Sequence, residues 1–393
     1  MDIRAILLVG GVAGEDALPP ESIGDIPLAF MDVLGLPVIE RVLRRLQRFG
    51  ICATTVITDA PSTILPFTQR AEIDPRAPQL EVVAGEELWD AAETTFRQYV
   101  SEGADLVIAM RLGPYVEVDY DEMIQHHLDK RCAISMAVDS QNATLELFVI
   151  SPAGRFDARE LFQSHLQRLR RECEPFPVKG YVNRLAQAAD LRRLGLDGLL
   201  ARNAMRPEAV EVKPGVFLGR GARIHRKARV VAPAFIGARG KVHAEALITR
   251  GSILEHHAEV DCGTVVENST LLPFTRLGAG LDVMHSVVGF HRLAHLIRNT
   301  EVEITDAKLV DMVPISPVSR LAGSTAALFA FIPKQIYRGV RALSHRESSA
   351  ADPECAEAGG SALNAPVLEA PASGVESSEF PSNLAVVRRY GDD

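Results

Sequence analysis

Short apolar runs alternate with helical stretches along the first part of the chain. Periodicity predicts helices over Pro37–Phe49, Ala91–Val100 and Asp121–Leu128. Between them lie continuous apolar runs that we expect to form strands, at Ala5–Val9, Thr54–Thr58, Leu80–Val83, Asp105–Met110 and Ala133–Val138. Such strands, separated by helices, are typical of a parallel sheet covered on both faces. The pattern predicts a doubly wound, Rossmann-like α/β domain over residues 1–205.

The second part of the chain has a six-residue period. Counting by sixes from Val212 meets only large aliphatic residues: Val212, Leu218, Ile224, Val230, Ile236, Val242, Ile248, Leu254, Val260, Val266 and Leu272. From Ala222 to Thr270, the residue four places after each anchor is small. One aliphatic and one small residue per hexad fit a coil of triangular section, in which the aliphatic fills the interior and the small residue turns the corner. After Leu272 the frame slips, and Leu277 and Val283 start a new one.

This period resembles the hexapeptide-repeat left-handed parallel β-helix, which we expect over residues 206–312. Residues 313–345 then read as an amphipathic closing helix. The favoured interpretation is that this helix packs on the coil or on a second subunit, and weak contact with a membrane surface is the less favoured one. Residues 346–393 hold few large apolar residues and are predicted to be a disordered acidic tail, in which only Asn383–Tyr390 offers a short docking motif.

Charge and cysteine content narrow the function classes. The chain has 42 basic and 51 acidic residues, a net charge of −9. The tail, with nine acids and three arginines, accounts for −6 of it, which leaves −3 for the rest. An acidic chain argues against nucleic acid or an anionic membrane as the main partner. Five cysteines without a CxxC pair argue against a disulfide framework or a cysteine zinc site, and together with the absence of a signal-peptide pattern they predict a cytoplasmic protein.

A strand that runs into glycines stands at the start of the chain. Ile6–Val9 leads into Gly10, Gly11 and Gly14, a turn whose backbone N–H groups could approach a phosphate. Twelve residues after Gly14 comes segment 26–40 (IPLAFMDVLGLPVIE). With the hexad repeats, these segments resemble the sugar-1-phosphate nucleotidyltransferases, or NDP-sugar pyrophosphorylases, in the two-domain form of the mannose-1-phosphate guanylyltransferases. The resemblance covers about residues 3–310.

The resemblance implies a nucleoside triphosphate on the glycine-rich loop. A sugar 1-phosphate would attack the α-phosphorus and expel pyrophosphate, with Mg²⁺ and basic residues offsetting the charge. Here, however, the two aspartates that hold the family's metal align with Arg111 and Arg184. Other family positions also differ: the loop arginine is replaced by Glu15 and Asp16, the lysine before Pro-Leu by Ile26, the base-contacting glycine by Trp89, and the Glu-Lys-Pro segment is deleted.

Two arginines would repel Mg²⁺, which prefers carboxylate oxygens. We therefore expect a domain that has lost catalysis and binds neither metal nor cofactor. Arg111 and Arg184 could still hold an anion, because guanidinium pairs well with phosphate, and Gly10, Gly11 and Gly14 would contact the same ligand. The alternative is that both arginines are solvated surface charges of a vestigial domain.

The function expected is that of a sugar-nucleotide-binding regulatory or scaffold subunit, homo-oligomeric through its coil. The end of the repeat, 280–306, resembles segments of nucleotidyltransferase-like proteins connected with bacterial exopolysaccharide synthesis, which suggests that pathway and a partner enzyme within it. One alternative is an active nucleotidyltransferase whose Mg²⁺ is held by Asp119 and Asp121.

Stacked polar residues on the coil leave a further alternative open. His225, His243 and Asp261 are 18 residues apart, so three hexads per coil would place them in one column. Such a column could ligate a metal, or a histidine of it could serve as the base of a hexapeptide acyltransferase. The favoured interpretation is a polar ladder on the outer face.

Overall fold

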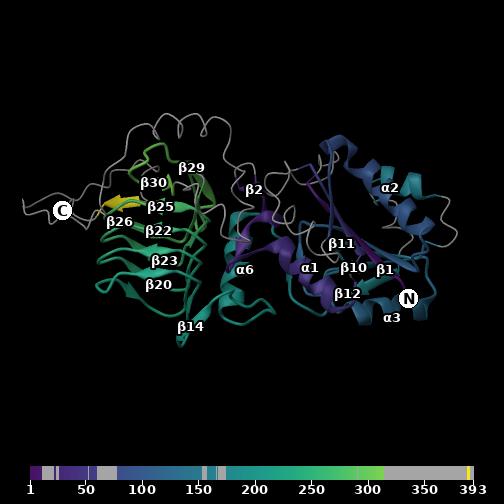
Figure 1. Cartoon of the computed structure of the whole chain (residues 1–393), viewed down its shortest axis with the longest axis horizontal. Helices are drawn as coiled ribbons and strands as arrows, with labels where there is room; N and C mark the ends of the chain where they lie inside the picture. The colour runs from purple at the N-terminus through teal and green to yellow at the C-terminus, as the bar shows by residue number, and fades with distance from the viewer. Residues whose placement is uncertain are drawn as a thin grey trace, which may run out of the picture.

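The fold is known from a computed structural model, which describes residues 1–10, 22–23, 26–51, 53–59, 78–152, 157–164, 166, 174–289, 291–313 and 387–389. Figure 1 shows an α/β part, drawn from purple to blue, beside a stack of short strands drawn in teal and green. Within the described residues, no helix is long and apolar enough to cross a membrane. The predicted closing helix, 313–345, lies outside the described residues except for Val313.

A seven-stranded sheet forms the centre of the α/β part, in the order β12-β10-β11-β8-β1-β6-β7. Its strands are β1 (Ile3–Val9), β6 (Ala53–Thr58), β7 (Gln79–Val82), β8 (Leu106–Arg111), β10 (Ile134–Val138), β11 (Thr144–Ile150) and β12 (Glu174–Pro177). All predicted strands are present. The sheet is mixed, however, because β11 runs antiparallel to both β10 and β8. The turn between β10 and β11 is too short for a crossover, so it can join only antiparallel strands.

Helices cover both faces of this sheet, as predicted. They are α1 (Val38–Arg48), α2 (Leu88–Ser101), α3 (Tyr120–Lys130), α4 (Ala158–Gln163) and α6 (Ala188–Leu199), with 3₁₀ turns η1 (Leu28–Phe30) and η3 (Gly85–Glu87). One face packs against α1 and α3, and the other against α2 and α4, while α6 packs against the coil that follows. The apolar stripe of α1 is buried and Gly50, with φ +79°, follows its end.

Three short pairs complete the α/β part. They are β2 (Ser22–Ile23) with β3 (Ile26–Pro27), β4 (Asp32–Val33) with β5 (Leu36–Pro37), and β9 (Tyr115–Val116) with β13 (Val182–Asn183). The β4–β5 hairpin leads directly into α1, and its turn holds Leu34 at φ +54° and Gly35 at φ +88°.

From Val210 onward the chain builds three further sheets, which it visits in turn. The first holds β14 (Val210–Lys213), β15 (Val216–Leu218), β18 (Ala234–Ile236), β21 (Ser252–Leu254), β24 (Thr270–Leu271), β27 (Ser286–Gly289), β28 (Arg292–His295) and β29 (Thr300–Glu303). The second holds β16 (Arg223–Ile224), β19 (Lys241–Val242), β22 (Glu259–Val260), β25 (Thr275–Leu277) and β30 (Val310–Met312). The third holds β17 (Arg229–Val230), β20 (Leu247–Thr249), β23 (Val265–Glu267), β26 (Leu281–Met284) and β31 (Val387–Arg389).

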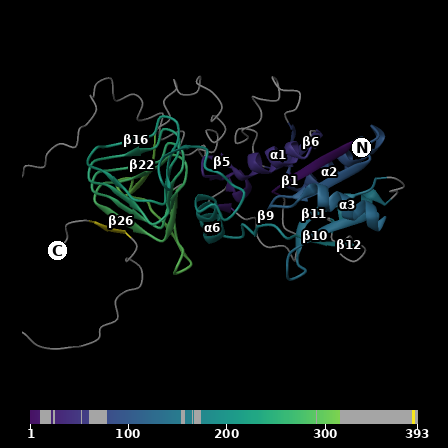
Figure 2. The same ribbon diagram turned by 90° about the horizontal axis from the view of Figure 1, so that it is seen from below.

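Parallel pairing gives this coil an 18-residue repeat over its first turns. Leu218 pairs with Ile236, Ile224 with Val242, and Val230 with Ile248, so three successive hexads supply one strand to each of the three sheets. The inward residues from Ile236 to Val266 are buried in one apolar cluster. Figure 2 shows the same strands from below, with α6 between the coil and the rest of the α/β part.

Two details of the predicted repeat are wrong. Val212 lies on β14, which pairs antiparallel with β15, and the residue is 51% exposed, so it is not an interior anchor. The frame also slips one hexad earlier than expected, because Leu254 pairs with Leu271, 17 residues on. Leu271 fills the coil, and Leu272 points out to the core of the α/β part. Because Leu271 and Leu272 are adjacent and both aliphatic, counting the sequence by sixes does not reveal where the frame slips.

The coil and the α/β part share one apolar core. Outward-facing Phe235, Ile253, Leu272 and Val287 of the coil are buried in the same cluster as Leu191 and Leu194 of α6. Gly195 of α6 leaves room for this contact, since a Cβ there would lie 2.8 Å from Cδ1 of Ile253. The coil is thus held to the sheet by one of its three faces.

Candidate ligand site at the carboxyl edge of the seven-stranded sheet

Four parallel strands, β1, β6, β8 and β10, end at the same edge of the sheet, which is where open α/β sheets bind ligands. Gly10 follows β1 with φ +97°, and a Cβ there would lie 1.9 Å from Oδ1 of Asp59, which follows β6. Only glycine fits this close approach. Gly11 and Gly14, the other predicted loop residues, lie outside the described residues.

Arg111 ends β8 at this edge, next to Leu8 of β1. Its Nη1 lies 3.2 Å from Oε2 of Glu146, and the two side chains are 27% and 25% exposed. Glu146 stands on β11 at φ +55°, opposite an irregularity in the β10–β11 register, and its N–H donates to Oγ1 of Thr144 at 3.0 Å. A non-glycine residue in this backbone region marks strain that is common at functional sites. Sequence patterns gave no signal for Glu146, because it falls inside an apolar run.

Arg184 follows β13 and forms a salt bridge with Asp139, which follows β10. The carboxyl of Asp139 also accepts the backbone N–H groups of Ala143 and Gln141. These bonds and the guanidinium of Arg184 lower the pKa of Asp139, the bond from Ala143 contributing most. Arg184 itself is 48% exposed, so its remaining N–H groups face solvent.

The two predicted arginines therefore lie at one edge, on either side of β11, and each has a carboxylate partner. A guanidinium has five N–H donors, and a carboxylate takes at most two of them. Both arginines can still receive a phosphate oxygen, but the nearby acids reduce the net positive charge of the site. The arrangement favours a ligand that carries both phosphate and hydroxyl groups over a bare anion, because the carboxylates can accept bonds from hydroxyls.

Asp119 and Asp121, the alternative metal ligands, have other roles. Asp119 is the N-cap of α3, where its Oδ1 accepts the N–H of Glu122 at 3.1 Å. Asp121 stands exposed in the first turn of the same helix. Both carboxylates are placed as is usual at a helix N-terminus, where they stabilise the free N–H groups.

The column on the coil stacks as expected, since His225 donates its N–H to Val242 O, His243 to Val260 O and Asp261 to Leu277 O. The side chains bond elsewhere: His243 Nε2 lies 2.8 Å from Oε1 of Glu259, and Asp261 Oδ2 lies 2.9 Å from Nη2 of Arg276. In the described part of the chain, one group of three potential metal ligands lies within 4.8 Å, formed by His243, Asp261 and Cys262. Cys262 is in a disulfide, which the spacing of the cysteines did not predict. Because Asp261 is also paired with Arg276, this group does not offer three free ligands.

A buried ionic cluster that the sequence did not predict joins the β4–β5 hairpin to the coil. Glu255, 1% exposed, accepts the N–H groups of Leu34 and Gly35 at 2.7 and 2.9 Å. Asp32 Oδ2 lies 2.6 Å from Nδ1 of His256. Burial and the charge of Asp32 raise the pKa of Glu255 to about 7. The hexad containing Glu255, His256 and His257 is unusually polar, which is the only sequence signal for this contact.

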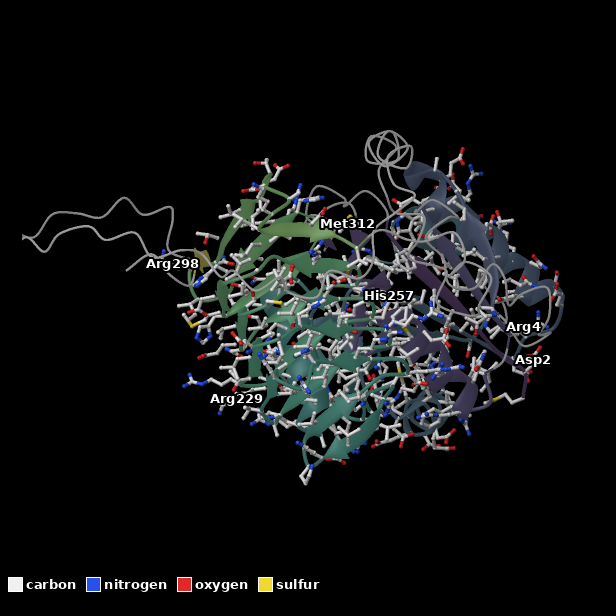
Figure 3. All side chains as sticks on the ribbon, turned by 60° about the vertical axis from the view of Figure 1, so that its left-hand side comes forward. Asp2, Arg4, Arg229, His257, Arg298 and Met312 are labelled. Carbon is white, nitrogen blue, oxygen red and sulfur yellow. The ribbon has the colours of Figure 1, made fainter. Side chains whose placement is uncertain are left out.

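Arg41 and Phe274 border this cluster. Arg41 donates from Nε and Nη1 to the backbone oxygens of Val33 and Arg206 at 3.2 and 3.1 Å, and its burial lowers its pKa. The ring of His257 stacks on Phe274 at 4.7 Å, and burial lowers the pKa of His257 to about 4. The cluster is a junction between two parts of the chain rather than an open site (Figure 3 labels His257).

A small cavity lies behind the carboxyl edge, between α1, β8 and β11. Val42, Met110, Tyr115 and Leu147 are among its lining residues. It has room for about one water molecule, which is far too little for a nucleotide. The open edge that carries Gly10, Arg111 and Arg184 is therefore the better candidate site.

No protein-family model and no curated protein matches the chain.

Proposed function

We propose that this protein binds a sugar nucleotide at the edge formed by Gly10, Arg111 and Arg184, and that it acts as a regulatory or scaffold subunit without catalysis. One observation carries the proposal: two partly exposed arginines stand at the carboxyl edge of the sheet, each with a carboxylate beside it. Guanidinium groups bind phosphates, and the paired carboxylates can accept sugar or ribose hydroxyls.

The same pairing opposes metal-dependent transfer. A Mg²⁺ ion needs carboxylate oxygens that are free to coordinate it, and Glu146 and Asp139 are each bonded to an arginine. The charge that builds up on the α-phosphate during transfer would lack its metal. Binding thus requires neither metal nor cofactor, and the phosphates would be neutralised by the arginines alone.

In this proposal the coil is a left-handed β-helix that assembles the protein into a homo-oligomer. The 18-residue parallel register, with aliphatic residues inward and small residues near the corners, supports that architecture. The domain division follows: residues 1–205 bind the ligand, 206–312 assemble subunits, 313–345 close the coil and 346–393 form the tail. The cytoplasm, which supplies sugar nucleotides, is the proposed compartment, and a polysaccharide-synthesis enzyme the proposed partner.

Isothermal titration tests the binding. Full-length protein is titrated with GDP-mannose, UDP-glucose and ADP-glucose in EDTA and again in Mg²⁺. We expect binding of at least one ligand with equal affinity in both buffers, and a rise of about tenfold or more in Kd for Arg111→Gln and Arg184→Gln, because each loses a charged contact. Arg97→Gln is the matched control, since Arg97 is also paired with a glutamate, at 2.8 Å, but lies on α2.

If no heat of binding were measured with any of the three sugar nucleotides, the proposal would be wrong. A pyrophosphate-release assay with the same protein, several sugar 1-phosphates, nucleoside triphosphates and Mg²⁺ is the companion measurement. Turnover that survives Arg111→Ala and is lost in Asp119→Asn would establish the active-enzyme alternative instead.

A further inference from the structure

The first turn of the coil differs from those that follow it. Its inward residues Leu218, Ile224 and Val230 are only half-buried, whereas Val242 and Ile248, one turn later, are 2% and 0% exposed. Among the described strands, β16 and β17 are the first of their sheets, so each has a neighbour on one side only. This end of the coil exposes apolar interior and unpaired backbone groups.

Basic residues surround that open end. Lys213, Arg220, Arg223, Arg226, Lys227 and Arg229 are all exposed, and segment 213–231 contains no acid. We call this surface the basic end (Figure 3 labels Arg229 at the outer side of the coil). Within the described chain, the one ion pair made by these six is between Lys227 and Glu245, at 3.8 Å, and both its members are well exposed.

Six positive charges around an open apolar end favour an occupant of negative charge. A second basic end is a poor occupant, because it would bring twelve positive charges together. An extended acidic segment fits on both counts: its backbone can pair with the free edges of β16 and β17, and its carboxylates can pair with the arginines. An acidic strand would also remove the mutual repulsion of the basic residues.

The chain itself contains such a segment. Residues 347–386 hold seven acids and no lysine, arginine or histidine, a net charge of −7 that complements the +6 of segment 213–231. The segment ends at β31, which pairs with β26, the last parallel strand of the sheet that begins with β17. Three strand spacings separate β26 from β17, about 15 Å, and a chain of this length can extend well beyond that.

We propose that the acidic segment 347–386 docks on the basic end of the same chain. Docking covers the free edges of β16 and β17 and shields the half-buried anchors from other proteins. Because the attraction is electrostatic and at the surface, it weakens as salt is added.

Zero-length cross-linking tests this proposal on the unmodified full-length protein. A carbodiimide joins a lysine to a carboxylate that already contacts it, and the basic end offers Lys213 and Lys227. We expect amide cross-links from these lysines to glutamates within 347–386, found by mass spectrometry, and a fall of fivefold or more in 0.5 M salt. The ion pair of Lys179 with Glu122, 2.5 Å apart, supplies the internal reference.

Variants of altered charge test whether the docking is electrostatic. Arg223→Glu with Arg229→Glu should reduce the tail cross-links of Lys227 at least fivefold relative to the reference, and Arg48→Glu, at an exposed position on α1, should not. Glu376→Gln with Glu379→Gln in the tail leaves the folded body intact and should lower the yield as well. If the yield of tail cross-links stayed the same in both sets of charge variants, the docking proposal would be wrong. If cross-links formed only between isotopically light and heavy chains, the contact would be between two molecules and not within one.

Discussion

The buried environment of Glu255 reverses the usual pH dependence of the stability that a carboxyl group contributes. Its carboxyl lies in the shared core, bonded to two backbone N–H groups and close to Asp32. A carboxyl whose pKa is raised by folding binds its proton more tightly in the folded state than in the unfolded one. It stabilises the fold fully below its unfolded pKa, and this stabilisation is lost as the pH rises through its folded pKa.

The pKa of Glu255, raised from 4.5 to about 7, sets a pH window for stability. We expect the free energy of unfolding to fall by about 3 kcal/mol or less between pH 4.5 and pH 7.5, measured by urea denaturation. Glu255→Gln should flatten this dependence, and should cost about 1–2 kcal/mol at the acid end because one backbone N–H loses its acceptor. An unchanged slope in the variant would show that Glu255 does not titrate in this window.

At the scale of elements, local periodicity predicted most of what the structure shows. Predicted strands and helices of the α/β part agree with the observed ones within a few residues. The apolar residues that become buried in α1 or β1 are close together in the sequence, so their spacing alone indicates the element. The direction of β11 and the frame slip at Leu271 were missed. Both depend on pairing with strands elsewhere in the chain.

The cap of α3 gives a prediction at this scale. Asp119→Ala removes the bond to the N–H of Glu122 and should lower the free energy of unfolding by about 1 kcal/mol in urea denaturation. Asp121→Ala, in the same first turn, should change it by less than half as much. If Mg²⁺ raised the Tm of the wild-type protein and not that of Asp119→Ala, the carboxylate would be a metal ligand rather than a cap.

For the whole molecule, the sequence predicted two parts but not how they join. The pattern of hexads marks Leu254 as inward and leaves Ile253 as an ordinary outward residue, yet both are buried. Similarly, Asp32 and His256 are 224 residues apart, and nothing in either segment points to the other. The candidate arginines were found only through the family resemblance, whereas their acidic partners required the folded edge.

Coupling between the two parts is testable at Ile253. Ile253→Ala should lower the free energy of unfolding by about 2–4 kcal/mol and split a single calorimetric transition into two, because it opens a gap between α6 and the coil. Val265→Ala, at an outward position on β23 away from α6, is the matched control. Equal losses in the two variants, without a second transition, would show that Ile253 does not couple the unfolding of the two parts.

The two ends of the coil differ in strand direction and in charge. Each of its three sheets finishes in an antiparallel strand, β29, β30 or β31, and β29 carries Glu301 and Glu303. The parallel register stops there, and the acids of β29 discourage pairing at that edge. Among the described strands, β16 and β17 keep free edges at the other end. Two first turns that meet end to end would bring twelve positive charges together, so the same charge that attracts the acidic segment keeps two copies of this protein from closing into a pair through this end.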